Sequence, residues 1–320
     1  MEYSLALNLS HVTEVGAIAA ARSAGFGNKI LADEKAVEAM RNAFNEMEID
    51  GKIVIGEGER DEAPMLFIGE KIGKGKGKKI DVAVDPLENT NATATLGPRA
   101  ISVLAASEEG GLFHAPDMYM EKIIVGSEAA GKIDLDAPVK DNLNVLAKGL
   151  KRNINDLVIV VLDRERNEKI VEDIRKEGAR VKFVPDGDLI PGVAACMRGT
   201  GVHAVMGIGA APEGVMAAAA VKCLKGEMLA RFWPKNDEER KRLISMGGDP
   251  KKIYSHNELA SGKTIIFCAT GVTNGDILRG VRYFGGGART HTLVMSSQTQ
   301  KVRFVDTTHV FDKKIINYRL

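Results

Sequence analysis

Residues 157–166 read LVIVVLDRER, six apolar residues followed by a charged cluster. A short apolar run that ends in polar residues is typical of a buried strand. Similar runs at 181–184 and 204–206 follow, and the three runs precede stretches of helical spacing near 168–176, 189–197 and 213–224. This alternation predicts βαβ units, and therefore a parallel sheet with helices on its faces.

Polar, glycine-containing clusters follow these three strands. They are Asp163-Arg164-Glu165-Arg166, Asp186-Gly187-Asp188 and Gly207-Ile208-Gly209. Ligands of open α/β sheets bind outside the carboxyl ends of the strands. The sequence therefore predicts a binding site where the three clusters meet.

The flanking sequence predicts a second sheet. Residues 1–50 have the spacing of two helices, a further helix is expected near 63–72, and short apolar runs upstream of residue 126 predict strands. Strand patterns resume at 264–267, 292–295 and 302–305. We therefore expect an α/β protein with a mixed sheet in residues 1–155, which the tail 262–320 rejoins, and a parallel α/β half in residues 156–261.

Composition narrows the function classes. The 320 residues carry a formal net charge of +1, which argues against a broad nucleic-acid-binding surface. No apolar stretch approaches the ~20 residues of a membrane span, and the N-terminus lacks a signal-peptide pattern. Cys196, Cys223 and Cys268 are scattered, as in proteins of reducing compartments. We expect a cytoplasmic protein with no nucleic-acid or membrane partner.

Five acidic residues stand at expected strand or helix ends, namely Asp33, Glu57, Asp85, Glu88 and Glu213. Hard divalent cations such as Mg²⁺ or Mn²⁺ prefer such oxygen ligands. Taken singly, several have simpler explanations, because Asp33 could cap a helix and Glu213 could favour a helix N-terminus. The pair Asp85 and Glu88 is harder to explain by packing, since it directly follows the apolar run 82–84.

The segment Asp85-Pro86-Leu87-Glu88-Asn89-Thr90 resembles the signature of the metal-dependent, lithium-sensitive phosphomonoesterases. Further motifs narrow the resemblance to the class II fructose-1,6-bisphosphatases of bacteria, and they cover nearly the whole chain. These motifs are VIGEGE (54–59), DEAPML (61–66), APDMYM (115–120), DGD (186–188), APEG (211–214) and ATGVT (269–273). The resemblance implies a layered sugar-phosphatase fold, a sugar bisphosphate substrate hydrolysed at its 1-phosphate, and a homo-oligomer.

The same resemblance assigns roles to individual residues. It implies two or more Mg²⁺ or Mn²⁺ ions on the five acidic residues named above. It implies turnover-supporting roles for Lys29, Asp61 and Thr90. The implied substrate contacts are Glu88, Asn89, Thr90, Tyr119, Arg164, Glu165, Arg166, Asp186, Gly187, Asp188 and the backbone near Ala210.

Four positions depart from the family pattern, and at one of them Asn167 stands where the family has histidine. Asn89 and Ala210 replace glycines, where a β-carbon costs energy if φ is positive. Glu165 places a negative charge beside an implied phosphate site. These changes touch substrate contacts rather than metal ligands. They leave open a sedoheptulose 1,7-bisphosphatase, an inositol-phosphate phosphatase, or a non-catalytic paralogue that binds a sugar phosphate.

Overall fold

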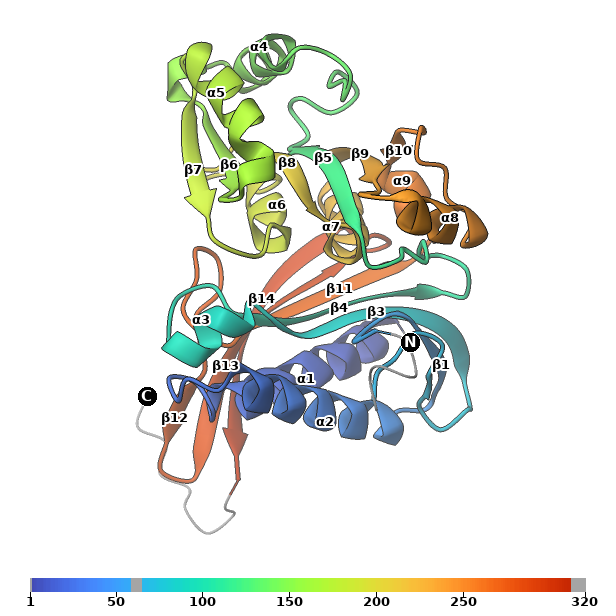
Figure 1. The fold of residues 1–320 in the computed structure, drawn as a ribbon. Helices are drawn as coiled ribbons and strands as arrows, with labels where there is room; N and C mark the ends of the chain where they lie inside the picture. Colours follow the sequence, from blue (N-terminus) through green and yellow to red (C-terminus); the bar gives the residue numbers. More distant parts are fainter. Residues whose placement is uncertain (1, 59–64, 312–320) are drawn as a thin grey trace. The chain divides into compact units, whose positions relative to one another are not determined.

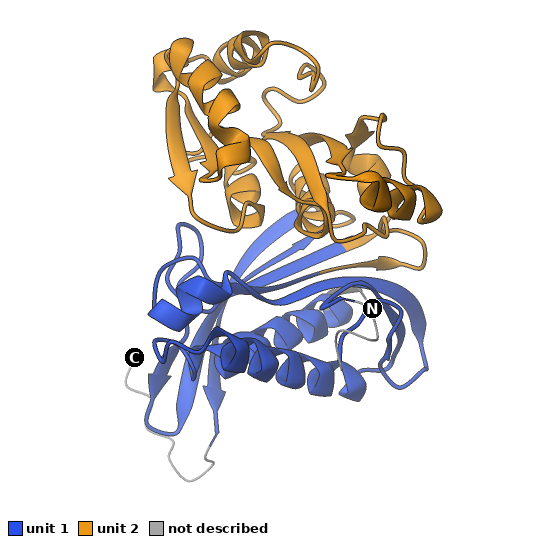
Figure 2. Ribbon diagram, viewed as in Figure 1, with its two compact units in different colours: residues 1–104, 266–296, 301–320 blue, residues 105–265, 297–300 orange. Residues whose placement is uncertain are grey.

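The computed structural model describes residues 2–58 and 65–311, which form two compact units (Figure 2). Unit 1 comprises residues 1–104, 266–296 and 301–320, and unit 2 comprises residues 105–265 and 297–300. The chain leaves unit 1 after Leu104 and returns to it at Ile266. None of the helices in the described part of the chain is both long and apolar enough to span a bilayer.

Unit 1 is built on an eight-stranded mixed sheet with the order β12-β13-β11-β4-β3-β1-β2, in which β14 pairs with β13 (Figure 1). Strand β1 runs parallel to β3, whereas β13 is antiparallel to β11, β12 and β14. The expected mixed sheet is therefore present, and strands of the C-terminal tail belong to it. The strands are β1 (Ile49–Ile55), β2 (Lys71–Ile72), β3 (Lys78–Glu88), β4 (Ile101–Glu108), β11 (Ile265–Gly271), β12 (Arg282–Phe284), β13 (Gly287–Ser296) and β14 (Lys301–Val310).

Helices α1 (Glu2–Ala21) and α2 (Lys29–Glu46) pack against each other and against this sheet. Asn28 caps α2, because its side chain accepts a hydrogen bond from the Leu31 amide at 3.0 Å. The buried face of α2 repeats every three or four residues, as expected for an amphipathic helix. Its members are Ala32, Ala36, Val37, Met40 and Phe44. A short third helix, α3 (Thr90–Thr95), follows β3 directly.

The helix expected near residues 63–72 is not formed in its described part. Residues 65–70 form turns and bends and lead into β2. Leu66 and Gly69 have positive φ values of 55° and 94°, which a right-handed helix cannot accommodate. Glu70 is instead buried and accepts a hydrogen bond from Arg41 Nε at 2.8 Å. Residues 59–64 lie outside the described part of the chain.

Unit 2 contains a six-stranded sheet with the order β10-β9-β5-β8-β6-β7. Strands β8, β6 and β7 are parallel, as predicted. The sheet as a whole is mixed, because β5, which was expected in the sheet of residues 1–155, pairs antiparallel with both β8 and β9. Apolar runs mark strands without encoding their direction, so the pattern could not show this. The strands are β5 (Tyr119–Val125), β6 (Val158–Leu162), β7 (Arg180–Val184), β8 (Ala204–Ala210), β9 (Glu227–Trp233) and β10 (Tyr254–Ser255).

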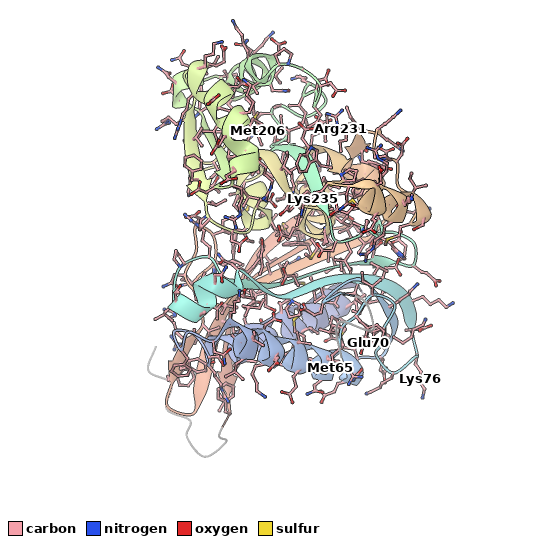
Figure 3. The ribbon with its side chains drawn as sticks, in the orientation of Figure 1. Met65, Glu70, Lys76, Met206, Arg231 and Lys235 are labelled. Carbon is pink, nitrogen blue, oxygen red and sulfur yellow. The ribbon has the colours of Figure 1, made fainter. Side chains whose placement is uncertain are left out.

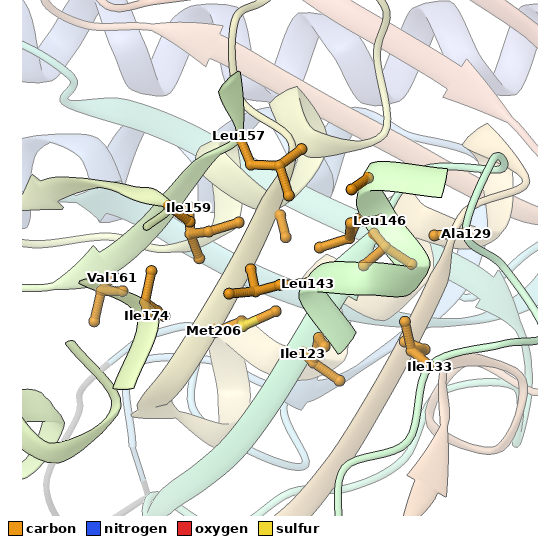
Figure 4. Packing of buried hydrophobic residues seen from close by; sticks show 14 of the residues in the cluster. Ile123, Ala129, Ile133, Leu143, Leu146, Leu157, Ile159, Val161, Ile174 and Met206 are labelled. Atoms are coloured by element: carbon orange, nitrogen blue, oxygen red, sulfur yellow. The ribbon is translucent and has the colours of Figure 1, made fainter. Parts of the chain in front are cut away.

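A cluster of apolar side chains covers one face of this sheet (Figure 4). Ile159 and Val161, two residues apart on β6, pack there with Met206 of β8 and with Leu143 and Leu146 of α4. Each such side chain contributes roughly 1.5–3 kcal/mol when fully buried. The helices of unit 2 are α4 (Val139–Leu150), α5 (Glu168–Lys176), α6 (Leu189–Ala195), α7 (Ala211–Leu224), α8 (Asp237–Ser245) and α9 (His256–Leu259), with 3₁₀ turns η1 (Ile154–Asp156) and η2 (Glu165–Asn167).

Candidate active site

Asp33 and Glu57 meet in unit 1. Asp33 lies inside α2, five residues after the capping Asn28, so it does not cap the helix, and Glu57 follows the end of β1. Their side chains are hydrogen-bonded to each other. Burial and the neighbouring Asp33 raise the pKa of Glu57 to about 8, and burial also raises the pKa of Asp33. The pair therefore holds a proton at neutral pH. This proton lies where a cation would lie between two carboxylates.

The carboxylates of Asp85 and Glu88 lie at the carboxyl end of β3. Asp85 Oδ1 accepts a hydrogen bond from the Leu87 amide at 3.0 Å, which spans Pro86 near the end of the strand. Glu88 is buried, with 5% of its surface exposed. An ionised carboxylate at that depth requires a positive partner.

Asn89 replaces a family glycine and adopts a left-handed backbone conformation. Its φ of 71° and ψ of 57° are left-handed, a conformation that asparagine tolerates better than most residues. Its side chain also accepts a hydrogen bond from the Ala92 amide at 3.1 Å, so it caps α3. Such a cap contributes about 1 kcal/mol, which offsets much of the cost of the left-handed backbone. The substitution therefore leaves this turn in the conformation that glycine would adopt.

The remaining residues implied for unit 1 are more dispersed. Thr90 is the first residue of α3, and Lys29 is exposed at the first position of α2. Asp61 lies outside the described residues. Within the described ranges 2–58 and 65–311, no three His, Cys, Asp or Glu side chains are already gathered closely enough to hold a metal ion. The oxygen-rich donors and the protonated pair fit a hard divalent cation, but their closure around it requires side-chain movement.

Glu213 belongs to unit 2, where it lies in the first turn of α7 and is partly exposed. It therefore occupies the helix start that the sequence suggested. A ligand set that combines Glu213 with the carboxylates of unit 1 stays a prediction.

The polar clusters at the carboxyl ends of β6 and β7 are connected by an ion pair. Arg164 lies 3.6 Å from Asp186, measured between Nη2 and Oδ1. Gly187 between the two aspartates has a φ of 70°, which favours glycine. The structure therefore joins two of the predicted substrate loops, although the guanidinium of Arg164 is partly neutralised by its partner.

Asp188 is held by a buried lysine that the motif analysis did not select. Lys122 Nζ lies 3.0 Å from Asp188 Oδ1 and 2.9 Å from Oδ2, and it also donates to the Ala210 carbonyl at 3.0 Å. The side chains of Lys122 and Asp188 are 0% and 3% exposed. A β-carbon at Gly209 would collide with the Asp188 carboxylate, so that glycine is required for close approach. The ion pair thus connects β5, β8 and the start of α6.

Three side chains of unit 2 form a cationic cluster, in which Arg166 and Lys235 lie over the ring of Tyr119. Arg166 Cζ lies 4.1 Å and Lys235 Nζ 4.0 Å from the centroid of the Tyr119 ring. Arg166 is also oriented by its hydrogen bond to the Ile208 carbonyl at 3.1 Å. In the part of the chain that the structure describes, neither cation is paired with a carboxylate. Two positive charges over one ring repel each other, and an anion between them would relieve that repulsion.

Asn167, at the position of the family histidine, is held by hydrogen bonds to the backbone of β8. It is 1% exposed, and its amide pairs with both the N–H of Ile208 at 2.8 Å and the carbonyl of Ile208 at 3.2 Å. Ala210 has a φ of −69°, so its β-carbon causes no strain. Glu165 is exposed at the start of η2. These departures therefore leave the loop geometry intact.

Sequence reasoning missed Lys122 and Lys235. Lys122 had a usable signal, because it is followed by the apolar run 123–125 in a strand whose pairing on both sides buries it. Lys235, which Figure 3 labels, lies beyond β9. It comes near Tyr119 through the β5–β9 pairing, in which Tyr119 is opposite Trp233. No local pattern around Lys235 encodes that pairing.

The sequence profile of the family described as "Bacterial fructose-1,6-bisphosphatase, glpX-encoded" matches residues 3–309. The chain belongs to the class II fructose-1,6-bisphosphatases. It is 48% identical over 337 residues to a D-fructose 1,6-bisphosphatase class 2/sedoheptulose 1,7-bisphosphatase of Synechococcus sp. (strain JA-3-3Ab), covering 98% of this chain and 97% of the relative. Proteins with the same description from Synechococcus elongatus and Thermosynechococcus vestitus are 46% and 44% identical, over 98% and 100% of both chains. The expected family is confirmed, and the chain is a phosphoric monoester hydrolase.

The acidic pair makes the stability of this bisphosphatase depend on pH when metal is removed. Between about pH 4.5 and about pH 8 the folded protein keeps a proton on Glu57 that the unfolded chain has released. Stability should therefore fall as pH rises through this window, by at most about 1.4 kcal/mol per pH unit for one proton. Glu57→Gln should flatten that slope because glutamine does not titrate. Urea unfolding with a chelator at several pH values tests this, and equal slopes for both proteins would contradict it.

Removing the buried lysine should destabilise this bisphosphatase. We expect Lys122→Met to cost about 3–5 kcal/mol, because Asp188 is left buried without its partner. The double variant Lys122→Met/Asp188→Leu should recover part of that loss, since it removes both charges. Denaturant unfolding of the three proteins measures the coupling. A loss below about 1 kcal/mol in the single variant would show that the pair is not the buried ionic contact described here.

Proposed function

We propose that this chain hydrolyses the 1-phosphate of fructose 1,6-bisphosphate, releasing fructose 6-phosphate and inorganic phosphate. Its family supports the reaction class. The observation that carries the choice of a bisphosphate is the cationic cluster of Arg166, Lys235 and Tyr119 in unit 2. A substrate with a single phosphate bound at the acidic site would have no use for that cluster.

We propose that Asp33, Glu57, Asp85, Glu88 and Glu213 hold two or more divalent ions, Mg²⁺ or Mn²⁺. Carboxylate oxygens are the donors that these ions prefer. When bound, such ions supply Lewis acidity and a lowered pKa for a coordinated water. The proton shared by Asp33 and Glu57 must leave for both carboxylates to act as ligands, so ion binding releases a proton and weakens as pH falls.

The remaining residues near Glu88 would orient the reacting groups. The Thr90 hydroxyl, with Asp61, would position the attacking water or accept its proton. Lys29 would support turnover by placing a positive charge near the phosphate. The backbone of Asn89 and Thr90 lies directly after Glu88, so contacts from this turn would fix the 1-phosphate relative to the carboxylates.

The loops of unit 2 would bind the rest of the substrate. Arg166 and Lys235 would bind the far phosphate, since guanidinium and ammonium groups are strong donors to phosphate oxygens. Tyr119 would align them and donate its hydroxyl. Sugar hydroxyls would meet Asp186, Gly187 and the backbone near Ala210. The remaining polar side chains, Arg164, Glu165 and Asp188, would border this subsite.

A second substrate has independent support. The relatives described above carry the names of both fructose and sedoheptulose bisphosphatases. A seven-carbon sugar also has two phosphates and would use the same cationic cluster, so we propose sedoheptulose 1,7-bisphosphate as the alternative substrate. The capped left-handed backbone of Asn89 and the extended backbone of Ala210 favour a catalytic protein over a non-catalytic paralogue. We further propose a cytoplasmic homo-oligomer.

Asp85→Asn should abolish turnover while the fold remains. Asparagine keeps the Oδ1 atom that accepts from the Leu87 amide, but it loses the negative charge needed for a cation. We expect kcat to fall at least about 100-fold, in line with the loss of one essential charge-stabilising group. Phosphate release with ample Mg²⁺ or Mn²⁺ measures it, and circular dichroism checks folding. Near-normal activity in a folded variant would refute the assignment.

Arg166→Ala and Lys235→Ala should weaken binding of the far phosphate. For fructose 1,6-bisphosphate we expect kcat/KM to fall about tenfold or more in each variant, because a hydrogen bond to a charged group contributes about 1.5–3 kcal/mol. Fructose 1-phosphate lacks the far phosphate, so its kcat/KM should change little. Lys241→Ala, which removes an exposed lysine of α8, serves as the matched control. Equal losses with both substrates would contradict a role at the far phosphate.

A further inference from the structure

A cavity of about 660 Å³ opens in unit 2 at the starts of the parallel strands. Its lining includes Val158 at the start of β6, Arg180 at the start of β7 and His203 just before β8. The predicted substrate loops follow the carboxyl ends of these same strands. A five-residue strand spans roughly 16 Å, so the cavity is separated from those loops by the length of the sheet.

Positive charge dominates the lining of this cavity. Lys151, Arg152, Arg180 and Arg198 contribute four permanent cations. Glu128 is the carboxylate of the lining, and it accepts a hydrogen bond from Arg198 Nε at 2.9 Å. Among the residues that the structure describes, Lys151, Arg152 and Arg180 have no carboxylate partner. The cavity therefore carries an excess of positive charge that a bound anion would neutralise.

Hydrogen bonds fix the backbone at Arg152 and Arg180, whose side chains are exposed at the cavity. Arg180 Nη2 donates to the Asp156 carbonyl at 2.7 Å, and the Arg180 amide donates to the Leu157 carbonyl at 3.0 Å. The Arg152 amide donates to the Ala147 carbonyl at 2.9 Å as α4 ends. The Arg180 guanidinium is thus oriented at the rim, and Arg152 projects from a fixed backbone position.

The pKa of His203 depends on the charged residues around the cavity. Its Nδ1 accepts a hydrogen bond from the Val158 amide at 2.8 Å, so the neutral ring carries its proton on Nε2 as a donor. Burial lowers the pKa of His203 and the charges of Arg152 and Arg180 lower it further, whereas the Val158 hydrogen bond and the charge of Asp156 raise it. Both guanidinium groups line the same cavity as His203.

We propose that this cavity binds the dianionic phosphate group of a small organic phosphate, at a site separate from the one that hydrolyses the substrate. Guanidinium groups match the geometry of phosphate oxygens, and Arg152 and Arg180 supply two of them. Leu146, Leu150 and Val202 add apolar walls that would contact the organic part. The volume suits a small molecule, since ligand pockets typically measure roughly 300–1,000 Å³. A concave site of this size favours a free phosphate ester over an extended polyanion.

Phenylphosphonate tests the proposal, because it combines a dianion with an apolar group and cannot be hydrolysed like an ester. It would be titrated by calorimetry into the full-length protein with Mg²⁺ present. Arg152→Ala/Arg180→Ala should weaken one saturable binding event at least about tenfold. Arg164→Ala/Arg166→Ala removes the same number of guanidinium groups from the substrate loops and should retain that event. Inorganic phosphate should bind at the same site more weakly, since it lacks the apolar group.

A second variant, expected to bind phenylphosphonate more tightly, distinguishes loss of the site from misfolding. Glu128→Gln removes the carboxylate of the lining and releases Arg198, so it should tighten phenylphosphonate binding several-fold. Unchanged binding in folded Arg152→Ala/Arg180→Ala, or binding lost only in the Arg164/Arg166 variant, overturns the proposal. If the Arg152/Arg180 variant does not fold, Glu128→Gln decides, and equal or weaker binding there overturns the proposal.

Discussion

Two partly buried carboxyl groups that share a hydrogen bond both ionise only at raised pH unless a cation is near, and Asp33 and Glu57 are held in this relation. The fold enforces the contact from both sides. Asn28 fixes where α2 begins, and Gly56 must lack a side chain because a β-carbon there would collide with the Leu66 carbonyl. The proton that relieves the repulsion in the free protein occupies the place that metal chemistry requires. The resulting instability at high pH is the cost of keeping a cation site ready.

Unit 2 handles buried charge in the opposite way. Lys122 and Asp188 are almost completely buried and neutralise each other. The Ala210 carbonyl accepts a further hydrogen bond from the ammonium group. With Asp188 satisfied internally, Arg166 and Lys235 keep their charge over the Tyr119 ring. One unit therefore presents carboxylates at its strand ends and the other presents cations.

The sequence predicted most elements, because apolar periodicity and glycine positions are local signals. It failed where pairing partners decide the outcome. The direction of β5 relative to β8 and the turn at residues 65–70 depend on contacts made elsewhere in the chain. Lys235 joins the candidate site only through the register of β5 and β9. The concerns over Asn89 and Ala210 turned on φ, which composition cannot reveal: one is left-handed and capped, and the other is extended.

Cations lie near both ends of the parallel β6–β7 pair, and the two ends require different explanations, since Arg164 and Arg166 follow β6 and Arg180 begins β7. At the carboxyl ends, the general behaviour of open α/β sheets is enough to account for a ligand site. At the amino ends that rule predicts nothing, and helix capping accounts only for Lys151 and Arg152, which lie where α4 terminates. Arg180 and Arg198 come from other segments and converge on the same cavity. Like charges that converge from separate segments repel one another and oppose folding unless an anion neutralises them. This excess of positive charge is the reason to interpret the cavity as a binding site rather than as solvated surface.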